Sequence, residues 1–88
     1  MITITERAKE ELKTVLIAAE AEPDEGLRLL PIPDGRCVLA LDTELSGDLV
    51  IEHKGYKVLL IGIEYFRIFD EKTVDYLDTE HGALLLVR

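Results

Sequence analysis

The sequence predicts an α+β fold in which a mainly antiparallel sheet is combined with an N-terminal amphipathic helix and one short helix. Apolar residues recur with a helical period near the start of the chain and then change to strand-like apolar runs. These runs are separated by tight turns at hairpin spacing. With 88 residues, of which 48% are apolar, the chain can bury one small core, so we expect a single domain over residues 1–88.

The first segment predicts a short strand followed by a helix. Ile2–Ile4 are expected to form the strand. Thr3 or Thr5 can cap a helix that runs to about Ala21, and Thr3 and Glu6 have the spacing of a capping box. The apolar face of this helix comprises Ala8, Leu12, Val15, Leu16 and Ala19.

A hairpin is predicted next. Leu27–Ile32 and Arg36–Asp42 flank the turn Pro33-Asp34-Gly35, in which proline presets φ, aspartate bonds the nearby backbone and glycine accepts a positive φ. Both strands carry apolar residues on both faces, so we expect the sheet to be covered on each side near its middle. Pro31 cannot donate a ladder hydrogen bond, so its nitrogen is expected to face outward or to lie at a bulge.

The remainder of the chain predicts a second hairpin, a short helix and two final strands. Asp48–His53 and Tyr56–Ile61 are expected to pair about a Lys54-Gly55 turn. Ile63–Phe69 suits one or two turns of helix. The strands that close the sheet are Thr73–Asp78 and Ala83–Arg88.

The composition excludes several classes of partner. Eighteen acidic residues against ten basic ones give a net charge of −8, so phosphate backbones and anionic membranes are repelled. No signal peptide or membrane-spanning apolar run is visible, and a single cysteine fits a reducing compartment, so we expect a cytoplasmic protein. Phosphate-binding glycine loops and catalytic motifs are not found, so we predict that the protein is not an enzyme.

Cys37 is the only thiol and the one candidate cofactor-binding residue. It shares a strand face with Leu39 and Leu41, which predicts burial as a small apolar residue. The alternative is a ligand or reactive thiol whose pKa is lowered by the neighbouring Arg36. Neither histidine is nearby in the sequence, so no base for a nucleophile is evident.

The remaining polar clusters do not match known ligand patterns. His53 and His81 lie beside turn glycines and are expected to be solvated, since no Cys-x-x-Cys or His-Glu-x-x-His spacing occurs. Asp42, Glu44 and Asp48 crowd one turn without the glycine and glutamate spacing of a calcium loop, so we expect an exposed acidic loop. The sequence therefore predicts no metal site.

Tyr65, Phe66 and Phe69 place three of the five aromatic residues in one short segment. In the simplest interpretation they cap the open end of the sheet and belong to the core. Alternatively, one or more of them anchor an interface with a second subunit or a protein partner. Both interpretations stay open.

Four short segments occur in an order that is typical of one protein family. Ile2-Thr3-Ile4-Thr5 precedes the helix, and Gly26-Leu27-Arg28-Leu29 opens the first hairpin. Asp48–Gly55 ends in a Lys-Gly turn, and Val74-Asp75-Tyr76 follows near the end of the sequence. In this order the segments resemble the HesB-like domain of the A-type iron–sulfur cluster carriers over nearly the whole chain. The resemblance implies the HesB-like fold and a link to iron–sulfur cluster assembly.

The sequence departs from that family at the residues that hold the cluster. The family uses one cysteine in a long loop after the Gly-Leu-Arg strand and two more in a C-terminal Cys-Gly-Cys-Gly tail. The sequence stops at Arg88, directly after the last predicted strand, so we expect this tail to be absent. When this sequence is aligned with the family pattern backwards from Asp48 and without gaps, Cys37 falls in the strand that follows the family's ligand loop. Pro31 then falls near the position of the ligand cysteine. Aligned forwards from Gly26, Cys37 falls near the ligand itself. We favour the first alignment, because the short turn is sufficient by itself.

The number of thiols decides the functional prediction. An iron–sulfur cluster typically takes four thiolates, and one cysteine per chain supplies two in a symmetric dimer. We therefore predict no cofactor and a non-catalytic accessory or binding module, with a protein partner or self-association. Two alternatives stay open: an iron or iron–sulfur carrier that uses Cys37 in a dimer or with an external thiol, and a purely structural homodimer built on Tyr65–Phe69.

Overall fold

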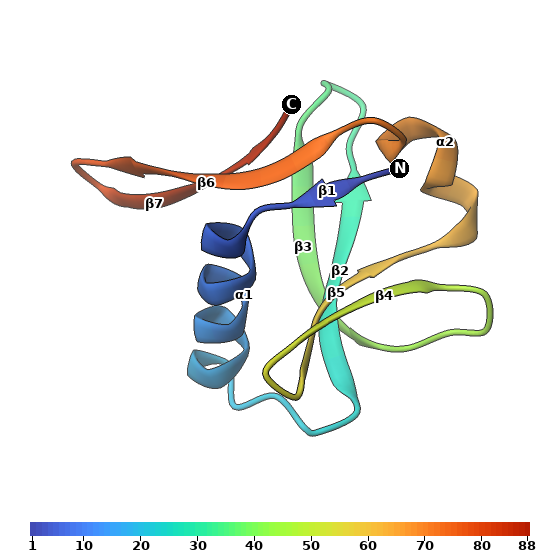
Figure 1. The fold of residues 1–88 in the computed structure, drawn as a ribbon, viewed down its shortest axis with the longest axis horizontal. Helices are drawn as coiled ribbons and strands as arrows, with labels where there is room; N and C mark the ends of the chain where they lie inside the picture. The colour runs from blue at the N-terminus through green and yellow to red at the C-terminus, as the bar shows by residue number, and fades with distance from the viewer.

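Two β-sheets and one long helix make up the computed structural model, which describes all of residues 1–88 (Figure 1). The predicted α+β class is confirmed. In chain order the elements are β1 (Thr3–Ile4), α1 (Glu6–Ala18), β2 (Glu25–Pro31), β3 (Cys37–Thr43), β4 (Leu49–His53), β5 (Tyr56–Ile61), the 3₁₀ turn η1 (Ile63–Tyr65), α2 (Phe66–Phe69), β6 (Thr73–Thr79) and β7 (Gly82–Val87). None of the helices is long and apolar enough to cross a membrane.

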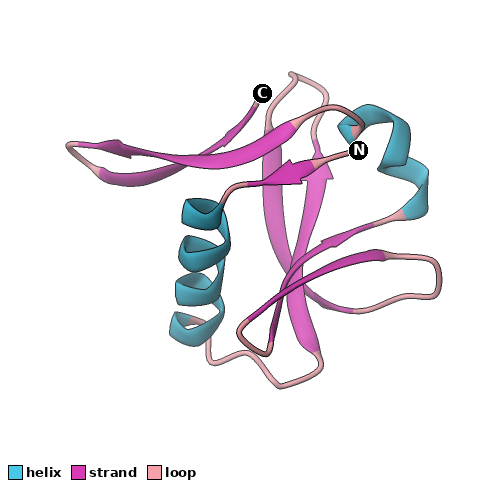
Figure 2. Ribbon diagram, viewed as in Figure 1, coloured by secondary structure: helices cyan, strands magenta, loops and turns pink.

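The strands form a four-stranded sheet in the order β3-β2-β5-β4 and a three-stranded sheet in the order β1-β6-β7 (Figure 2). The expectation that the last two strands close a single sheet is therefore wrong. The physical reason is the N-terminal segment, which pairs in parallel with β6: Thr3 N–H donates to Lys72 O at 2.9 Å, and Thr5 N–H donates to Val74 O at 3.0 Å. These bonds tie the β6–β7 hairpin to β1 instead of to an edge of the larger sheet.

The start of α1 is fixed by a single threonine cap. Thr5 is the N-cap, and its Oγ1 accepts a hydrogen bond from Ala8 N–H at 3.0 Å. Thr3 lies in β1, so the predicted capping box between Thr3 and Glu6 is wrong. The threonine that follows the strand, and not the one within it, begins the helix.

The end of α1 comes three residues earlier than predicted, at Ala18 instead of Ala21. Glu20 adopts a left-handed φ of 55° and donates its N–H to Ile17 O, while Ala21 N–H donates to Leu16 O at 3.1 Å. These two bonds form a Schellman motif, which satisfies the last carbonyls of the helix and turns the chain toward β2.

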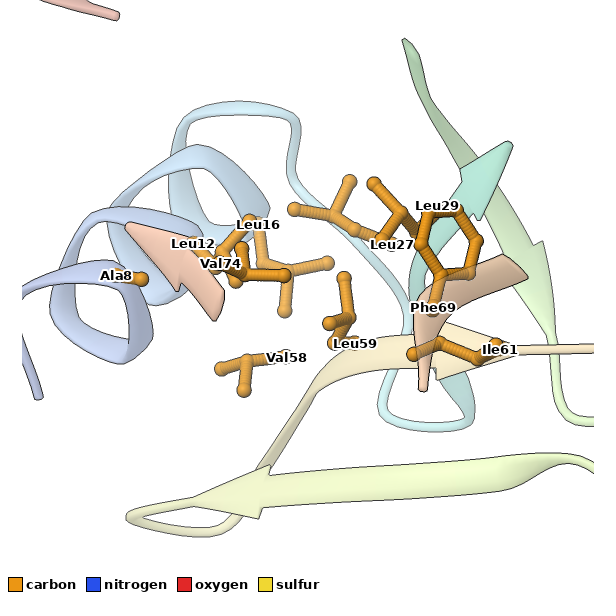
Figure 3. Close-up of a cluster of buried hydrophobic side chains, with 10 residues drawn as sticks. All are labelled: Ala8, Leu12, Leu16, Leu27, Leu29, Val58, Leu59, Ile61, Phe69 and Val74. Carbon is orange, nitrogen blue, oxygen red and sulfur yellow. The ribbon is translucent and has the colours of Figure 1, made fainter. Parts of the chain in front are cut away.

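The hydrophobic core lies between α1, the four-stranded sheet and β6 (Figure 3). Its ten buried residues are Ala8, Leu12, Leu16, Leu27, Leu29, Val58, Leu59, Ile61, Phe69 and Val74. The central strands β2 and β5 are buried on both faces, as predicted for the middle of the sheet. The same expectation is wrong for β3, an edge strand on which Val38 and Leu41 are exposed.

Both predicted hairpin turns are confirmed. In the first, Gly35 has a φ of +88° and donates to Ile32 O at 3.0 Å, while Arg36 N–H donates to Asp34 Oδ1 at 3.0 Å. Ile32 N–H also donates to Arg36 O at 2.9 Å, which starts the ladder between β2 and β3. The second turn joins β4 to β5 at Lys54-Gly55.

Pro31 ends β2 without the loss of a ladder bond. In an antiparallel ladder, hydrogen-bonded residue pairs alternate with pairs that are not hydrogen-bonded. Because Ile32 and Arg36 form a hydrogen-bonded pair, the next pair, Pro31 and Cys37, is not hydrogen-bonded, and the nitrogen of Pro31 faces away from β3. On that other side, the pairing of β2 with β5 runs only from Gly26 to Arg28. The predicted outward position of the proline nitrogen is confirmed.

A buried ion-pair network joins β2, β3 and the connection to β4. The Arg28 side chain on β2 is only 8% exposed. Its Nε donates to Asp42 Oδ2 at 2.6 Å, and its two terminal nitrogens bind Asp48 at 3.0 and 2.7 Å. The Thr43 carbonyl accepts a further bond at 3.2 Å, and Asp48 Oδ2 also accepts from Leu45 N–H at 2.7 Å. Such a bidentate pair of arginine and carboxylate fixes the relative position of the two side chains as well as neutralising their charges.

The acidic cluster of the β3–β4 connection is only in part the exposed loop that the sequence predicted: Glu44 is exposed, as expected, whereas Asp48 is not. Asp48 is 2% exposed because it lies under the Arg28 guanidinium. Hydrogen bonds from Arg28 hold the pKa values of both Asp42 and Asp48 below their ordinary values. The third member, Glu44, pairs with Lys57 at 3.3 Å, so the three acids each have a cationic partner.

Replacing Asp48 by asparagine should lower the free energy of unfolding by about 3 kcal/mol, because the Arg28 charge is then left buried without its main partner. Chemical denaturation at pH 7 measures this loss. The matched variant Asp42→Asn should lose less, because the Asp42 side chain is more exposed. Equal losses in the two variants would contradict the account.

The same network should make the free energy of unfolding depend on pH, with a loss of stability in acid. The pKa of Asp48 is lower in the folded than in the unfolded chain, so its contribution is complete above the ordinary carboxyl pKa, near 4. It is lost as the pH falls through the folded-state pKa. Denaturation between pH 7 and pH 2 should therefore show a smaller acid-dependent loss in Asp48→Asn than in the wild type.

Replacing Gly35 by valine should destabilise the protein by roughly 1 kcal/mol or more, because a β-branched residue resists the positive φ at this turn. No atom lies within 4 Å of a Cβ built at this position, so strain and not a steric clash causes the loss. Thermal denaturation measures it. An unchanged midpoint would mean that the turn is not formed as described.

Candidate functional site

The thiol of Cys37 lies at the first position of β3, directly opposite Pro31 in the β2–β3 ladder. The pairing continues without interruption to Glu25 and Thr43. The side chain is partly buried and packs against the hydrophobic core, as does that of Leu39. The short turn leaves no long loop before the cysteine, so a paired strand holds it.

Two hollows meet at Cys37. One, of about 330 Å³, lies between the hairpin turn, α2 and the end of β7 and includes Pro33, Ile68 and Val87 in its lining. The other, of about 450 Å³, lies between Gly35–Cys37 and the residues Leu84–Val87 of β7. The thiol is thus reached through apolar surroundings at the junction of both sheets.

Burial raises the pKa of the Cys37 thiol above its ordinary value. The expectation that Arg36 lowers this pKa is wrong, because its guanidinium turns back to Asp34, with Nε 2.6 Å from Oδ2. A thiol with a raised pKa is protonated at neutral pH, and the thiolate is the form that attacks electrophiles or binds metals. The raised pKa therefore disfavours the thiolate, and we predict a packed thiol in place of a reactive one.

No group of three or more histidine, cysteine, aspartate or glutamate residues is arranged to hold a metal ion. His81 is fully exposed in the β6–β7 turn, as predicted. The same prediction is wrong for His53, whose side chain at the end of β4 is only 11% exposed. Its Nε2 lies 3.4 Å from Glu10 Oε1 without a hydrogen bond. Glu10 also binds Lys54, and these contacts lower its pKa to about 2.

The three aromatic residues separate between the core and the surface. Phe69 is fully buried, and Tyr65 packs edge-to-face against it with ring centroids 6.5 Å apart. Phe66 is 39% exposed and lines an apolar hollow of about 350 Å³ that also includes Ile2, Leu49 and Ile61. Phe69 therefore belongs to the core, and Tyr65 packs against it. Phe66 is the aromatic residue of this segment that is exposed enough to contact another protein.

Sequence reasoning missed the burial of the Arg28 side chain and most of that of His53. For Arg28 a signal existed: a single arginine lies within an apolar strand, and three acids follow on the next turn. For His53 the sequence offers no such signal, because its contact with Glu10 comes from the packing of α1 against the β4–β5 hairpin.

No protein-family model matches this sequence, and no curated protein matches it. Solved structures do match. The crystal structure of SufA from Escherichia coli, involved in the biosynthesis of iron–sulfur clusters, is 22% identical, with a TM-score of 0.78 over 99% of this chain and 83% of that chain. The crystal structure of IscA with the [2Fe–2S] cluster is 18% identical, with a TM-score of 0.69 over 100% and 84%. A solution structure of a protein from Aquifex aeolicus is 25% identical, with a TM-score of 0.71 over 99% and 89%.

These likenesses confirm the predicted resemblance at the level of fold. This chain has the HesB-like fold of SufA and IscA over almost its whole length. At such sequence identities the fold is shared while individual site residues need not be.

Labelling of Cys37 with a thiol reagent at pH 7 should be slow in the native protein and several-fold faster in denaturant, because burial both shields the sulfur and raises its pKa. Absorbance of the released chromophore measures the rate, and Cys37→Ser is the blank. A native rate equal to that of the denatured chain would mean that the thiol is accessible and ionised.

Proposed function

We propose that this protein is a non-catalytic module with the HesB-like fold that serves iron–sulfur cluster assembly by binding another protein, without ligating a cluster through its own thiols. The observation that supports this most directly is the combination of a shared fold over the full chain with a thiol that lies on a paired strand. A cytoplasmic location, which a single unpaired thiol fits, is part of the same proposal.

Three features of the site argue against cluster ligation within residues 1–88. Only one thiol is present, whereas a cluster typically takes four thiolate ligands. The pKa of Cys37 is raised by burial, which disfavours the thiolate. Cys37 does not belong to any group of three or more histidine, cysteine, aspartate or glutamate side chains that could hold a metal ion. This chain shares its fold with SufA and IscA. We therefore propose that it acts through its surface, by binding another protein.

A second candidate is an iron or iron–sulfur carrier that uses Cys37 in a dimer or with an external thiol such as glutathione. The observation in its favour is that Cys37 is only partly buried and borders two hollows. A third is a purely structural homodimer built on Tyr65–Phe69, which the exposure of Phe66 and Ile68 favours.

Anaerobic reconstitution of the purified protein with iron and sulfide, with and without glutathione, should leave it colourless, because the ligand set is incomplete. Visible absorbance and bound iron measure the outcome. Cys37→Ser is the matched control and should behave as the wild type does. A stable cluster spectrum that is lost in Cys37→Ser would refute the proposal and support the carrier function.

A further inference from the structure

Two apolar hollows open beside α2, and exposed apolar side chains border them. Ile63, Phe66 and Ile68 are all exposed, although the same segment packs Phe69 into the core. Phe66 lines the hollow of about 350 Å³, and Ile68 lines the hollow of about 330 Å³. Phe69 is part of the wall of both, so the two hollows adjoin the same short helix.

Two cationic side chains at these hollows, Arg67 and Lys72, have no acidic partner. Every other lysine and arginine is paired with a carboxylate of its own chain. Arg67 lines the same hollow as Phe66, and Lys72 lines the same hollow as Ile68. Both cations are exposed. Together with Ile63, Phe66 and Ile68 they form what we call the α2 surface.

The acids near α2 do not neutralise these two cations. Asp70 and Glu71 bind the ammonium group of Met1. Glu64 turns its carboxylate back against Gly62. In a chain of net charge −8, in which carboxylates are in excess, the two unpaired cations of the α2 surface are therefore available to carboxylates of another molecule.

We propose that the α2 surface binds a segment of another protein in which apolar side chains stand next to acidic residues. This inference rests on the proposed function and adds the chemistry of the partner. One apolar side chain of the partner fills the hollow beside Phe66, which removes apolar surface of both proteins from water. A neighbouring carboxylate pairs with Arg67, whose guanidinium can bind it in a bidentate manner. A second acid pairs with Lys72 on the other side of α2.

The charge distribution favours a short protein segment over a larger anionic partner. A nucleic acid or an anionic membrane is large enough to meet the field of the whole molecule, whose net charge of −8 repels it. A short segment meets only the α2 surface, because salt screens exposed charges beyond about 8 Å at physiological ionic strength. Locally, that segment faces apolar side chains between two cations.

A library of short random peptides displayed on phage, selected against the immobilised full chain, tests this inference. The recovered peptides should combine an aromatic or branched aliphatic residue with neighbouring aspartate or glutamate. Fluorescence polarisation then measures the affinity of a recovered peptide in solution. This affinity should fall roughly tenfold or more in Phe66→Ala, which removes the apolar contact, and in Arg67→Glu, which reverses the charge. It should also fall as the salt concentration rises.

Matched variants away from α2 separate a local effect from a change in net charge or folding. Helix α1 and the β6–β7 turn lie on the opposite side of the molecule from α2 (Figure 1). Leu77→Ala removes an exposed apolar side chain of β6, and Lys9→Glu makes the same charge change on α1, so both should bind the peptide as the wild type does. Because Phe66 and Arg67 are exposed, their variants should keep the circular dichroism spectrum of the wild type. Arg67→Glu remains a readout if Phe66→Ala fails to fold.

Several results would overturn the inference. One is a selection that recovers no peptide, or only peptides without acidic residues. Another is a peptide whose affinity is the same in the wild type, Phe66→Ala and Arg67→Glu. Self-association of the wild type that is lost in Phe66→Ala, without any peptide recovered, would assign the α2 surface to a second copy. A colourless protein in the reconstitution whose peptides ignore the α2 variants would keep the proposed function and lose this inference, whereas a cluster spectrum would refute the proposed function whatever the peptides show.

Discussion

The β2–β3 hairpin is the constraint on which the rest of the structure depends, because it is fixed at both ends. At its closed end, the residues 32–36 form a turn in which three backbone N–H groups donate internal hydrogen bonds. At its open end, the Arg28 guanidinium binds two aspartates that follow on the chain. A slip of one residue would move Leu27 and Leu29 out of the core, so the burial of these leucines and the ion pair select the same register.

This constraint has a direct chemical consequence. Cys37 is the first residue of β3, so the fixed register holds its backbone in a ladder and turns its side chain toward the core. A thiol held in this way cannot be presented by a flexible loop, and burial keeps it protonated. The chain therefore combines the fold of SufA and IscA with a cysteine environment that favours packing over ligation. This is why the function that we propose is placed on its surface, where Phe66 is exposed.

Turn residues and apolar periodicity predict much of this fold from the sequence. The features that the sequence did not predict depend on contacts between residues that are distant in the sequence. The turns at Pro33-Asp34-Gly35 and Lys54-Gly55 follow from residue types alone, and so does the period of α1. The division into two sheets depends on the pairing of β1 with β6, about seventy residues away in the sequence. A strand of two residues is too short to show an alternation of apolar and polar residues, so the sequence does not predict this pairing. The burial of His53 likewise depends on a helix distant in sequence. The position of Cys37 on a strand was foreseen, whereas the turning of Arg36 toward Asp34 was not.

Amide hydrogen exchange at Leu30 and Val38 tests the central claim most directly. These residues form the hydrogen-bonded pair next to the Pro31–Cys37 position, so their N–H groups report whether the backbone beside the thiol is in the ladder. The account predicts slow exchange at both amides, similar to that of Leu59 in the buried strand β5. Exchange at Val38 as fast as in an unprotected loop would show that the cysteine segment is free of the sheet, and would contradict the account.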